Sequence, residues 1–264
     1  MADEVLLQVE DGIATVTLNR PNALNSLSAA LCTRLREVWA EARSRADISV
    51  VILTGAGSKA FTAGIDRSEI PVNDGEAPPY DPFTYDDMLN MIGPKANDVW
   101  KPVIVAVNGL ACGGAFYLLG EADIVIAAEH ATFFDPHVSY GMAAVYEPIL
   151  LSGRMHFGDL ARMSLTGLGE RLSAETACRT GLVSEVVPAE ELPGLAQRIA
   201  TAIAASPTVP VQATVRALWT ARRHGLTAAL DSANFLLGAG NQRELLRRGQ
   251  QSFATRQRPE SITR

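Results

Sequence analysis

The sequence predicts an α/β fold followed by a helical C-terminal region. Up to Ala189, short strand-like runs alternate with segments of helical periodicity, which is typical of parallel strands joined by right-handed crossovers. From Ala189 onward only helical patterns occur, and Pro207 and Gly225 interrupt them. The 264 residues therefore divide into an expected core, residues 1–195, and an expected helical region, residues 196–264.

The first predicted elements are a hairpin, a helix and a buried strand. Val5–Glu10 and Ile13–Leu18 are β-rich runs that flank Asp11-Gly12, a dipeptide typical of tight hairpin turns. Ser28 is placed to cap a helix whose apolar residues recur at helical spacing. Ser49–Thr54 carries a continuous apolar run without alternation, so it predicts a strand that is buried on both faces.

The middle of the chain predicts a loop and then strands and helices in alternation. Ile70–Pro82 holds four of the 14 prolines, so we expect an exposed loop there. A helical stretch is expected from Tyr85 to about Trp100, followed by a buried strand over Val103–Val107. A helix is expected from Ala115 to about Glu121.

The last elements of the core are short. Strands are expected over Asp123–Ala127, Ala131–Phe134 and Leu182–Val187. Ser173 is placed to cap a short helix that ends at Gly181.

Composition excludes several classes of protein. Apolar residues make up 47% and charged residues 20%, which is globular rather than disordered composition. The 23 lysines and arginines against 29 aspartates and glutamates give a net charge of −6, and no basic block suggests a nucleic-acid partner. Cys32, Cys112 and Cys178 form no C-x-x-C pair, which fits free thiols in a reducing compartment. With no secretory signal and no apolar run of 18 residues, we expect a cytoplasmic protein without a membrane partner.

Two glycine-containing turns follow two of the predicted buried strands. They are Phe61–Asp66 and Asn108–Ala115. Glycine allows backbone N–H groups to point into a cleft, and two such groups aimed at one point would stabilise a carbonyl oxygen that gains negative charge. Tight turns without any function have the same pattern, and neither turn matches a nucleotide-binding motif.

Longer motifs resemble one known family, the enoyl-CoA hydratase/isomerase (crotonase) superfamily. Thr17–Leu27 resembles its opening motif, and Phe61–Asp66 resembles its F-x-A-G-A-D motif. Lys101–Gly109 is similar to its K-P-V-I-A-A-V-N-G block. Leu165–Val183 resembles its L-T-G…S-A…G-L-V series, and Ser252–Pro259 resembles its closing motif. The resemblance covers nearly the whole chain in the family's order.

The resemblance implies a fold, an assembly and a substrate. The fold would be a spiral of ββα turns with a C-terminal helical trimerisation region, and the protein would be a homotrimer or a dimer of trimers. The substrate would be an acyl-CoA thioester, so coenzyme A enters as part of the substrate and no separate cofactor is expected. The backbone N–H groups of Ile65 and Gly114 would form the oxyanion hole. The resemblance assigns substrate binding to residues beside these donors: Leu24, Ala63, Gly64 and Gly113.

The sequence departs from the family at both positions where hydratases carry a catalytic glutamate. Tyr117 stands at the first position and His137 at the second. An imidazole moves protons near neutral pH, whereas a phenol with an ordinary pKa near 10 is a poor base. Glu147 is a candidate partner that would orient His137, or else an acid at the start of a helix. Tyr117 either donates a hydrogen bond in the pocket or fills space there.

The other candidates are expected to be structural. Cys112 has no evident base beside it, so we interpret it as a small buried residue. Asp66 is interpreted as structural and Tyr140 as core or pocket wall. The remaining histidines show no metal-ligand spacing, so no metal is expected. They are His130, His156 and His224.

The sequence therefore predicts an enzyme of the enoyl-CoA hydratase/isomerase family, a lyase or isomerase by its most common label. Loss of both glutamates argues against efficient hydration. Isomerisation, decarboxylation, thioester hydrolysis and hydrolytic cleavage of a β-dicarbonyl share the same enolate and stay open. A non-catalytic acyl-CoA-binding protein is the alternative from a different class.

Overall fold

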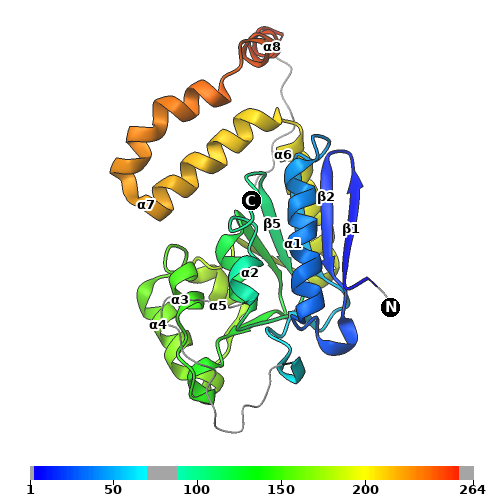
Figure 1. The fold of residues 1–264 in the computed structure, drawn as a ribbon, viewed down its shortest axis with the longest axis vertical. Coiled ribbons are helices and arrows are strands. Elements are labelled where there is room, and N and C mark those ends of the chain that lie inside the picture. The colour runs from blue at the N-terminus through cyan, green and yellow to red at the C-terminus, as the bar shows by residue number, and fades with distance from the viewer. Residues whose placement is uncertain (1–2, 70–87, 256–264) are drawn as a thin grey trace.

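The computed structural model describes residues 3–69 and 88–255 and contains two sheets covered by helices (Figure 1). The larger sheet has the strand order β1-β2-β3-β5-β7-β10; β1 and β2 pair antiparallel and the other neighbours pair parallel. The smaller sheet has the order β4-β6-β8-β9. The strands are Val5–Glu10 (β1), Ile13–Leu18 (β2), Val50–Gly55 (β3), Ala60–Thr62 (β4), Val103–Val107 (β5), Leu110–Cys112 (β6), Ile124–Ala128 (β7), Thr132–Phe134 (β8), Leu172–Ser173 (β9) and Glu185–Val187 (β10).

The chain builds both sheets at once. β3, β5 and β7 enter the larger sheet, and the strand that follows each of them enters the smaller sheet. Helix α2 (Ala115–Glu121) comes after the second of these strand pairs. The predicted α/β class with a ββα spiral is therefore confirmed.

The helices surround these sheets. The α-helices are α1 (Ala29–Ser44), α2, α3 (Tyr146–Leu151), α4 (Phe157–Thr166), α5 (Ala174–Arg179), α6 (Leu192–Ala204), α7 (Thr208–Gly240) and α8 (Arg243–Ala254). Short 3₁₀ helices are η1 (Pro21–Ala23), η2 (Arg67–Glu69), η3 (Met88–Met91), η4 (His137–Tyr140), η5 (Gly167–Gly169) and η6 (Ala189–Glu191).

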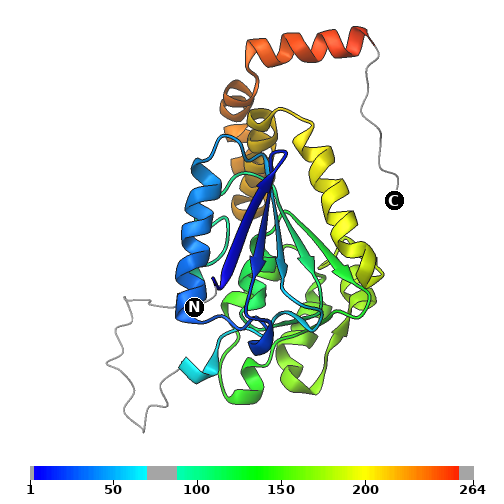
Figure 2. The ribbon, with the colours of Figure 1, turned by 90° about the vertical axis from the view of Figure 1, so that its right-hand side faces the viewer.

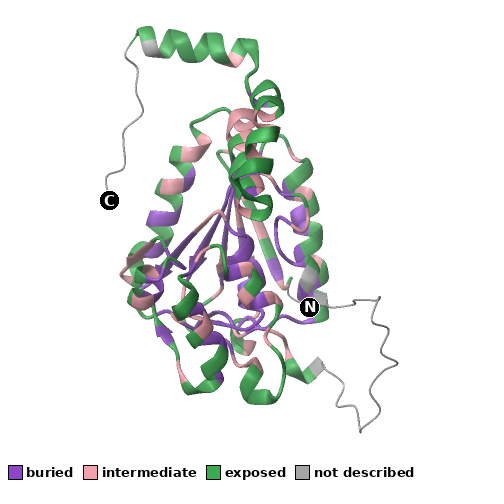
Figure 3. Ribbon diagram, turned by 90° about the vertical axis from the view of Figure 1, so that its left-hand side faces the viewer, coloured by how far each residue is buried: buried purple, intermediate pink, exposed green. Residues whose placement is uncertain are grey.

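A different helix covers each face of the larger sheet, α1 on one side and α6 on the other (Figure 2). On β3, Val51 and Leu53 belong to the core on the α1 side. Val50 and Ile52 belong to the core on the α6 side. Both faces of β3 are thus buried, and Figure 3 shows the same for the central strands of the sheet. This burial explains the continuous apolar run of the strand.

Local turn chemistry agrees with the sequence at three places. Asp11 and Gly12 have φ of 49° and 80°, the left-handed values that a tight hairpin turn requires. The Ser28 side chain accepts a hydrogen bond from the N–H of Leu31 and caps α1. Ser173 caps α5 in the same way through Thr176. These predictions are confirmed.

Other predicted elements differ in the structure. The helical stretch expected from Tyr85 to about Trp100 is wrong in its described part, where the 3₁₀ helix η3 ends at Met91 and turns follow. Pro94 has no N–H to donate, which favours these turns over a helix. The strand expected over Leu182–Val187 is limited to β10. The expected loop Ile70–Pro82 lies outside the described residues.

The C-terminal region is helical, as expected. Gly225, with φ 83° and ψ 169°, divides α7 into two helical arms that form a hairpin beyond the sheets (Figure 1). The expected boundary between residues 195 and 196 falls within α6, whose Leu195 and Ala196 pack against the larger sheet. Among the described residues, no helix combines the length and the apolar character needed to cross a membrane.

Candidate functional site

The two glycine turns lie side by side. β4 and β6 pair in parallel, which places the turns that follow them at the same edge of the smaller sheet. A β-carbon on Gly64 would lie 2.7 Å from the carbonyl oxygen of Cys112 and 3.1 Å from the backbone nitrogen of Gly114. Gly64 also has φ of +83°. Only glycine fits such a close approach with this backbone conformation.

The second turn, at Gly114, packs as closely against the first turn. A β-carbon on Gly114 would lie 3.4 Å from the Cα of Gly64 and 3.0 Å from the Cδ1 atoms of Leu27 and Leu89. Gly114 is the N-cap of α2, so its N–H lies at the positive end of a helix. Within residues 3–69 and 88–255, no acceptor takes the N–H of Ile65 or of Gly114. Both donors proposed from the sequence therefore remain available at one place.

His137 begins η4, beside the second turn and between two buried carboxylates. Its Nδ1 contacts Asp135 Oδ1 in a short hydrogen bond, and its backbone N–H donates to the same oxygen at 3.1 Å. Its Nε2 lies 3.5 Å from Oε1 of Glu147. A β-carbon on Gly113 would lie 3.7 Å from His137 Cε1. The imidazole is thus placed against the turn that carries Gly114.

The structure places the His137 side chain beside that of Glu147, the partner that the sequence suggested. Glu147 lies in the first turn of α3 and is only 4% exposed. The sequence reasoning missed Asp135, which is fully buried and whose Oδ2 has no hydrogen-bond partner within the described part of the chain. A signal was present, because an aspartate two residues before a helical turn commonly accepts a backbone N–H there.

Tyr117 lies inside α2 and is 4% exposed. Its ring stacks on that of Tyr146, with centroids 6.2 Å apart and planes at 25°. Because Tyr146 immediately precedes Glu147 in α3, the stack fixes α2 against the helix that carries this carboxylate. Tyr117 therefore forms part of the aromatic packing beside His137 and Glu147.

A groove of about 340 Å³ lies beside the first turn. Leu24 lines it, is 37% exposed and has a left-handed φ of 52°. The Leu24 carbonyl accepts the N–H of Ala63 at 3.0 Å, which links the groove to the turn at Gly64. Lys59, a residue that the sequence analysis did not select, is an exposed cation on the same groove.

Three other acidic or nucleophilic side chains are buried or held in hydrogen bonds. Burial raises the pKa of the Cys112 thiol to about 12, so almost no thiolate exists near neutral pH. Glu121 is buried on α2, accepts the N–H of Ala96 at 2.7 Å and pairs with Arg223 at 2.9 Å. Hydrogen bonds from Ser68 and Arg20 lower the pKa of Asp66 to about 2.

The remaining candidates lie apart from this arrangement. Tyr140 is 50% exposed, with Arg67 over its ring, so it is not a core residue. His130 bonds the carbonyl of Ser58, and His156 is exposed beside Asp159. Among residues 3–69 and 88–255, the potential metal ligands that lie together are those of Asp135, His137 and Glu147, whose ligand atoms are within 4.8 Å of one another. The expected absence of a metal stays a prediction.

Comparison with known proteins identifies the family. Residues 8–261 match the sequence model described as Enoyl-CoA hydratase/isomerase. The chain belongs to this family. The resemblance found in its motifs is confirmed, and the chain is an enzyme of a family that acts on acyl-CoA thioesters.

Individual family members match nearly the full length. An (E)-benzylidenesuccinyl-CoA hydratase from Thauera aromatica is 35% identical over 258 residues, 97% of this chain and 97% of that protein. A 1,2-epoxyphenylacetyl-CoA isomerase from Escherichia coli (strain K12) is 33% identical over 231 residues, 88% of this chain and 87% of the relative. The crystal structure of an enoyl-CoA hydratase/isomerase from Mycobacterium paratuberculosis has a TM-score of 0.87 at 33% identity and covers 99% of both chains.

Proposed function

We propose that this enzyme binds an acyl-CoA thioester with its carbonyl oxygen between the N–H groups of Ile65 and Gly114. The observation that carries the proposal is the convergence of the two turns, which leaves both donors without an acceptor among the described residues. Donors held rigidly in this way stabilise the negative charge that develops on the thioester oxygen as an enolate forms. Gly64 allows the backbones to come this close, and Gly113 supplies the left-handed φ of 50° in the second turn. Both are expected to contact the reacting end of the substrate.

The thioester's coenzyme A portion would lie in the groove at Leu24, which the hydrogen bond from Ala63 to the Leu24 carbonyl connects to the first turn. The exposed ammonium of Lys59 suits a phosphate there. Relatives named as acting on benzylidenesuccinyl-CoA and 1,2-epoxyphenylacetyl-CoA support a coenzyme A thioester as the substrate class. No cofactor beyond the coenzyme A of the substrate is needed for enolate chemistry of this kind.

We infer that His137 moves the proton. Asp135 accepts from Nδ1, which leaves Nε2 as the nitrogen that exchanges protons and lies near Glu147. Tyr117, at the other glutamate position, is a phenol stacked on Tyr146 and a poor base. A site with one imidazole in place of two water-binding glutamates is expected to hydrate enoyl-CoA weakly.

The Asp135–His137–Glu147 arrangement favours reactions in which an imidazole activates water. An acid that orients an imidazole and stabilises its charged form is the arrangement by which hydrolases raise the basicity of histidine. Hydratase-type chemistry is the first candidate function. Thioester hydrolysis and hydrolytic cleavage of a β-dicarbonyl are therefore the second candidate. Both begin from the same bound carbonyl, so they differ only in the bond that breaks.

An assay of α-proton exchange tests the catalytic proposal without knowledge of the acyl group. Incubated with butyryl-CoA in D₂O, the enzyme should incorporate deuterium at the α-carbon, which mass spectrometry detects. A panel of enoyl-, malonyl-type and cyclic β-keto thioesters then identifies the reaction. Tight binding of every thioester with no exchange and no turnover would instead establish a non-catalytic acyl-CoA-binding protein.

We propose a homotrimer or a dimer of trimers. The α7 hairpin exposes large apolar side chains, with Leu226 70%, Leu230 64% and Phe235 77% exposed. Its two arms line an apolar groove of about 500 Å³. Apolar surface of this kind is costly to leave in water and marks an interface. Light scattering at micromolar concentration should give three or six times the chain mass of 28.2 kDa. A monomeric mass would contradict this assembly.

The free thiols of Cys32, Cys112 and Cys178 fit a reducing compartment. On this basis we propose a cytoplasmic enzyme.

A further inference from the structure

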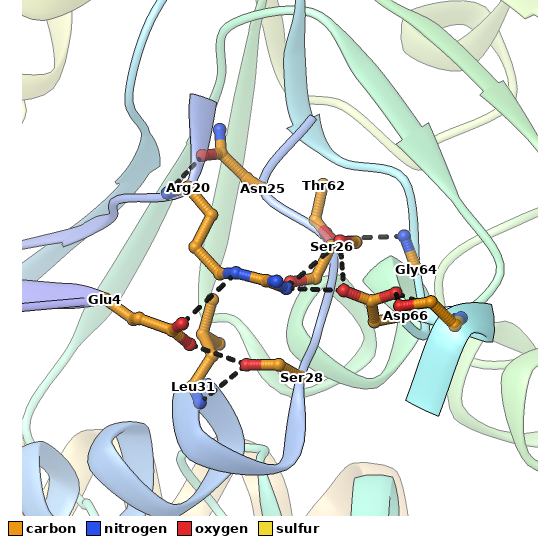
Figure 4. A network of polar contacts seen from close by, with 10 residues as sticks. Glu4, Arg20, Asn25, Ser26, Ser28, Leu31, Thr62, Gly64 and Asp66 are labelled. Atoms are coloured by element: carbon orange, nitrogen blue, oxygen red, sulfur yellow. Dashed lines mark hydrogen bonds and ion pairs between the residues drawn. The ribbon is translucent and has the colours of Figure 1, made fainter. Parts of the chain in front are cut away.

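Arg20 is connected to the turn that carries Ile65 (Figure 4). Its Nη1 donates to Asp66 Oδ2 at 2.8 Å and to the carbonyl oxygen of Ser26 at 2.7 Å. The hydroxyl of Ser26 donates to the same aspartate oxygen at 3.2 Å. Arg20 and Asp66 are 46 residues apart in the sequence, so this link joins two separate loops.

The backbone fastens the same turn on both sides of Ile65. The N–H of Leu27 donates to the carbonyl of Gly64 at 2.8 Å, and the N–H of Asp66 donates to the carbonyl of Leu27 at 3.1 Å. These two bonds form a short parallel bridge between Leu27 and Ile65. The direction of the Ile65 N–H is therefore set by the peptide units before and after it.

We propose that Arg20, acting through Asp66 and Ser26, is a positioning residue that holds the Ile65 N–H in line with that of Gly114. The proposal rests on the proposed oxyanion hole and identifies what keeps it rigid. Without the ion pair, the turn would keep its backbone bonds and the hydroxyl contacts of Ser26 and Ser68 with Asp66. It would lose its charged link to the loop that carries Arg20. An N–H group displaced by a fraction of an ångström makes a weaker hydrogen bond to the developing oxyanion.

The second contact of Arg20 explains why an arginine suits this place. Its Nε lies 3.3 Å from Oε1 of Glu4, whose other oxygen accepts the hydroxyl of Ser28, the cap of α1. One planar guanidinium thus joins the start of the chain, the α1 N-terminus and the turn at Asp66. A lysine has a single point charge and cannot make these contacts together. The Arg20 and Asp66 side chains are 20% and 13% exposed, so the pair is partly shielded from water.

Three single variants and one double variant test the proposal through α-proton exchange of butyryl-CoA. Arg20→Met and Asp66→Asn should each lower kcat about tenfold to a hundredfold, the scale of a misplaced reacting group, and leave KM within about threefold. Arg20→Lys should fall between wild type and Arg20→Met. The double variant Arg20→Met/Asp66→Asn should lose clearly less than the product of the two single losses, because both changes remove the same ion pair.

Infrared spectroscopy of bound [1-¹³C]butyryl-CoA gives a readout that a merely structural role would not move. In the wild type, the thioester carbonyl stretch should shift to lower frequency on binding, because two N–H groups polarise it. In Arg20→Met the shift should shrink while the thioester stays bound. Arg45→Met is the matched control, since Arg45 pairs with Glu41 at 2.9 Å and Asp47 at 2.7 Å at the far end of α1. It should leave kcat and the carbonyl shift unchanged.

The outcomes separate this proposal from the proposed function. No carbonyl shift in the wild type would refute the oxyanion hole itself. A wild-type shift that Arg20→Met and Asp66→Asn retain, with unchanged kcat, would refute the positioning role alone. A raised KM with unchanged kcat would also refute it, because Arg20 would then be binding the substrate.

Discussion

Replacing Gly114 by valine is expected to lower kcat about a hundredfold to a thousandfold, the usual effect of losing one oxyanion donor. The added side chain would press on the Cδ1 atoms of Leu27 and Leu89, each 3.0 Å from the new β-carbon, and on the turn at Gly64. The two leucine ends can shift and keep the fold, but the N–H groups of Ile65 and Gly114 would no longer face one point. The loss corresponds to about 3–4 kcal/mol of transition-state stabilisation.

The measurement is α-proton exchange of butyryl-CoA, with circular dichroism and thermal unfolding to verify the fold. Gly158→Val is the matched control, because a β-carbon on Gly158 in α4 meets no atom within 4 Å. It should retain the wild-type rate. A folded Gly114→Val protein that exchanges the α-proton at the wild-type rate would rule out the proposed geometry.

Local sequence signals were sufficient for much of the fold. The Asp11-Gly12 turn and the Ser28 cap depend on residues within a few positions of one another, so their chemistry is visible in the sequence. The buried run at Ser49–Thr54 reports burial on both faces and hence a central parallel strand. The helix predicted from Tyr85 to about Trp100 was wrong in its described part. Periodic apolar residues suggested a helix there, whereas Gly93-Pro94 favours turns.

The site was predictable only in part, because its contacts join distant segments. Motif positions placed Ile65, Gly114 and His137, but no local signal shows that Nε2 of His137 faces Glu147 rather than Asp135. That orientation follows from the fold of α3 against α2, which the stack of Tyr117 on Tyr146 secures. Side chains that act through a partner far along the chain leave no periodic pattern in the sequence, so the sequence does not predict their contacts.

The two halves of the proposed mechanism, carbonyl polarisation and proton transfer, also differ in how far the sequence predicts them. Carbonyl polarisation depends on backbone N–H groups, whose placement follows from glycine turns and strand pairing. Proton transfer depends on side chains, and by the motif resemblance Tyr117 and His137 stand where hydratases carry glutamates. On the proposed mechanism, binding of a thioester and the fate of its enolate can therefore vary independently, and His137 would decide the fate of the enolate.

Replacing His137 by alanine is expected to lower kcat at least about a hundredfold, the scale of losing a general acid–base group. Wild-type activity should follow one ionisation, that of the His137 imidazole. If neutral His137 is the base, activity rises with pH through that ionisation, and if the imidazolium is the acid, activity falls. His137→Ala should remove this limb of the pH profile in either case.

Glu147→Gln tests the contact that shapes this ionisation. Removing the carboxylate 3.5 Å from Nε2 makes the imidazolium less favourable, so the midpoint of the activity profile should move to lower pH. Asp135→Asn should move it in the same direction and also lower kcat, because Nδ1 loses its orienting acceptor. His156→Ala is the matched control, since that histidine has a side chain 79% exposed and pairs only loosely with Asp159 at 3.9 Å. Rapid hydration of crotonyl-CoA that survives His137→Ala would show that the proton is moved by another group.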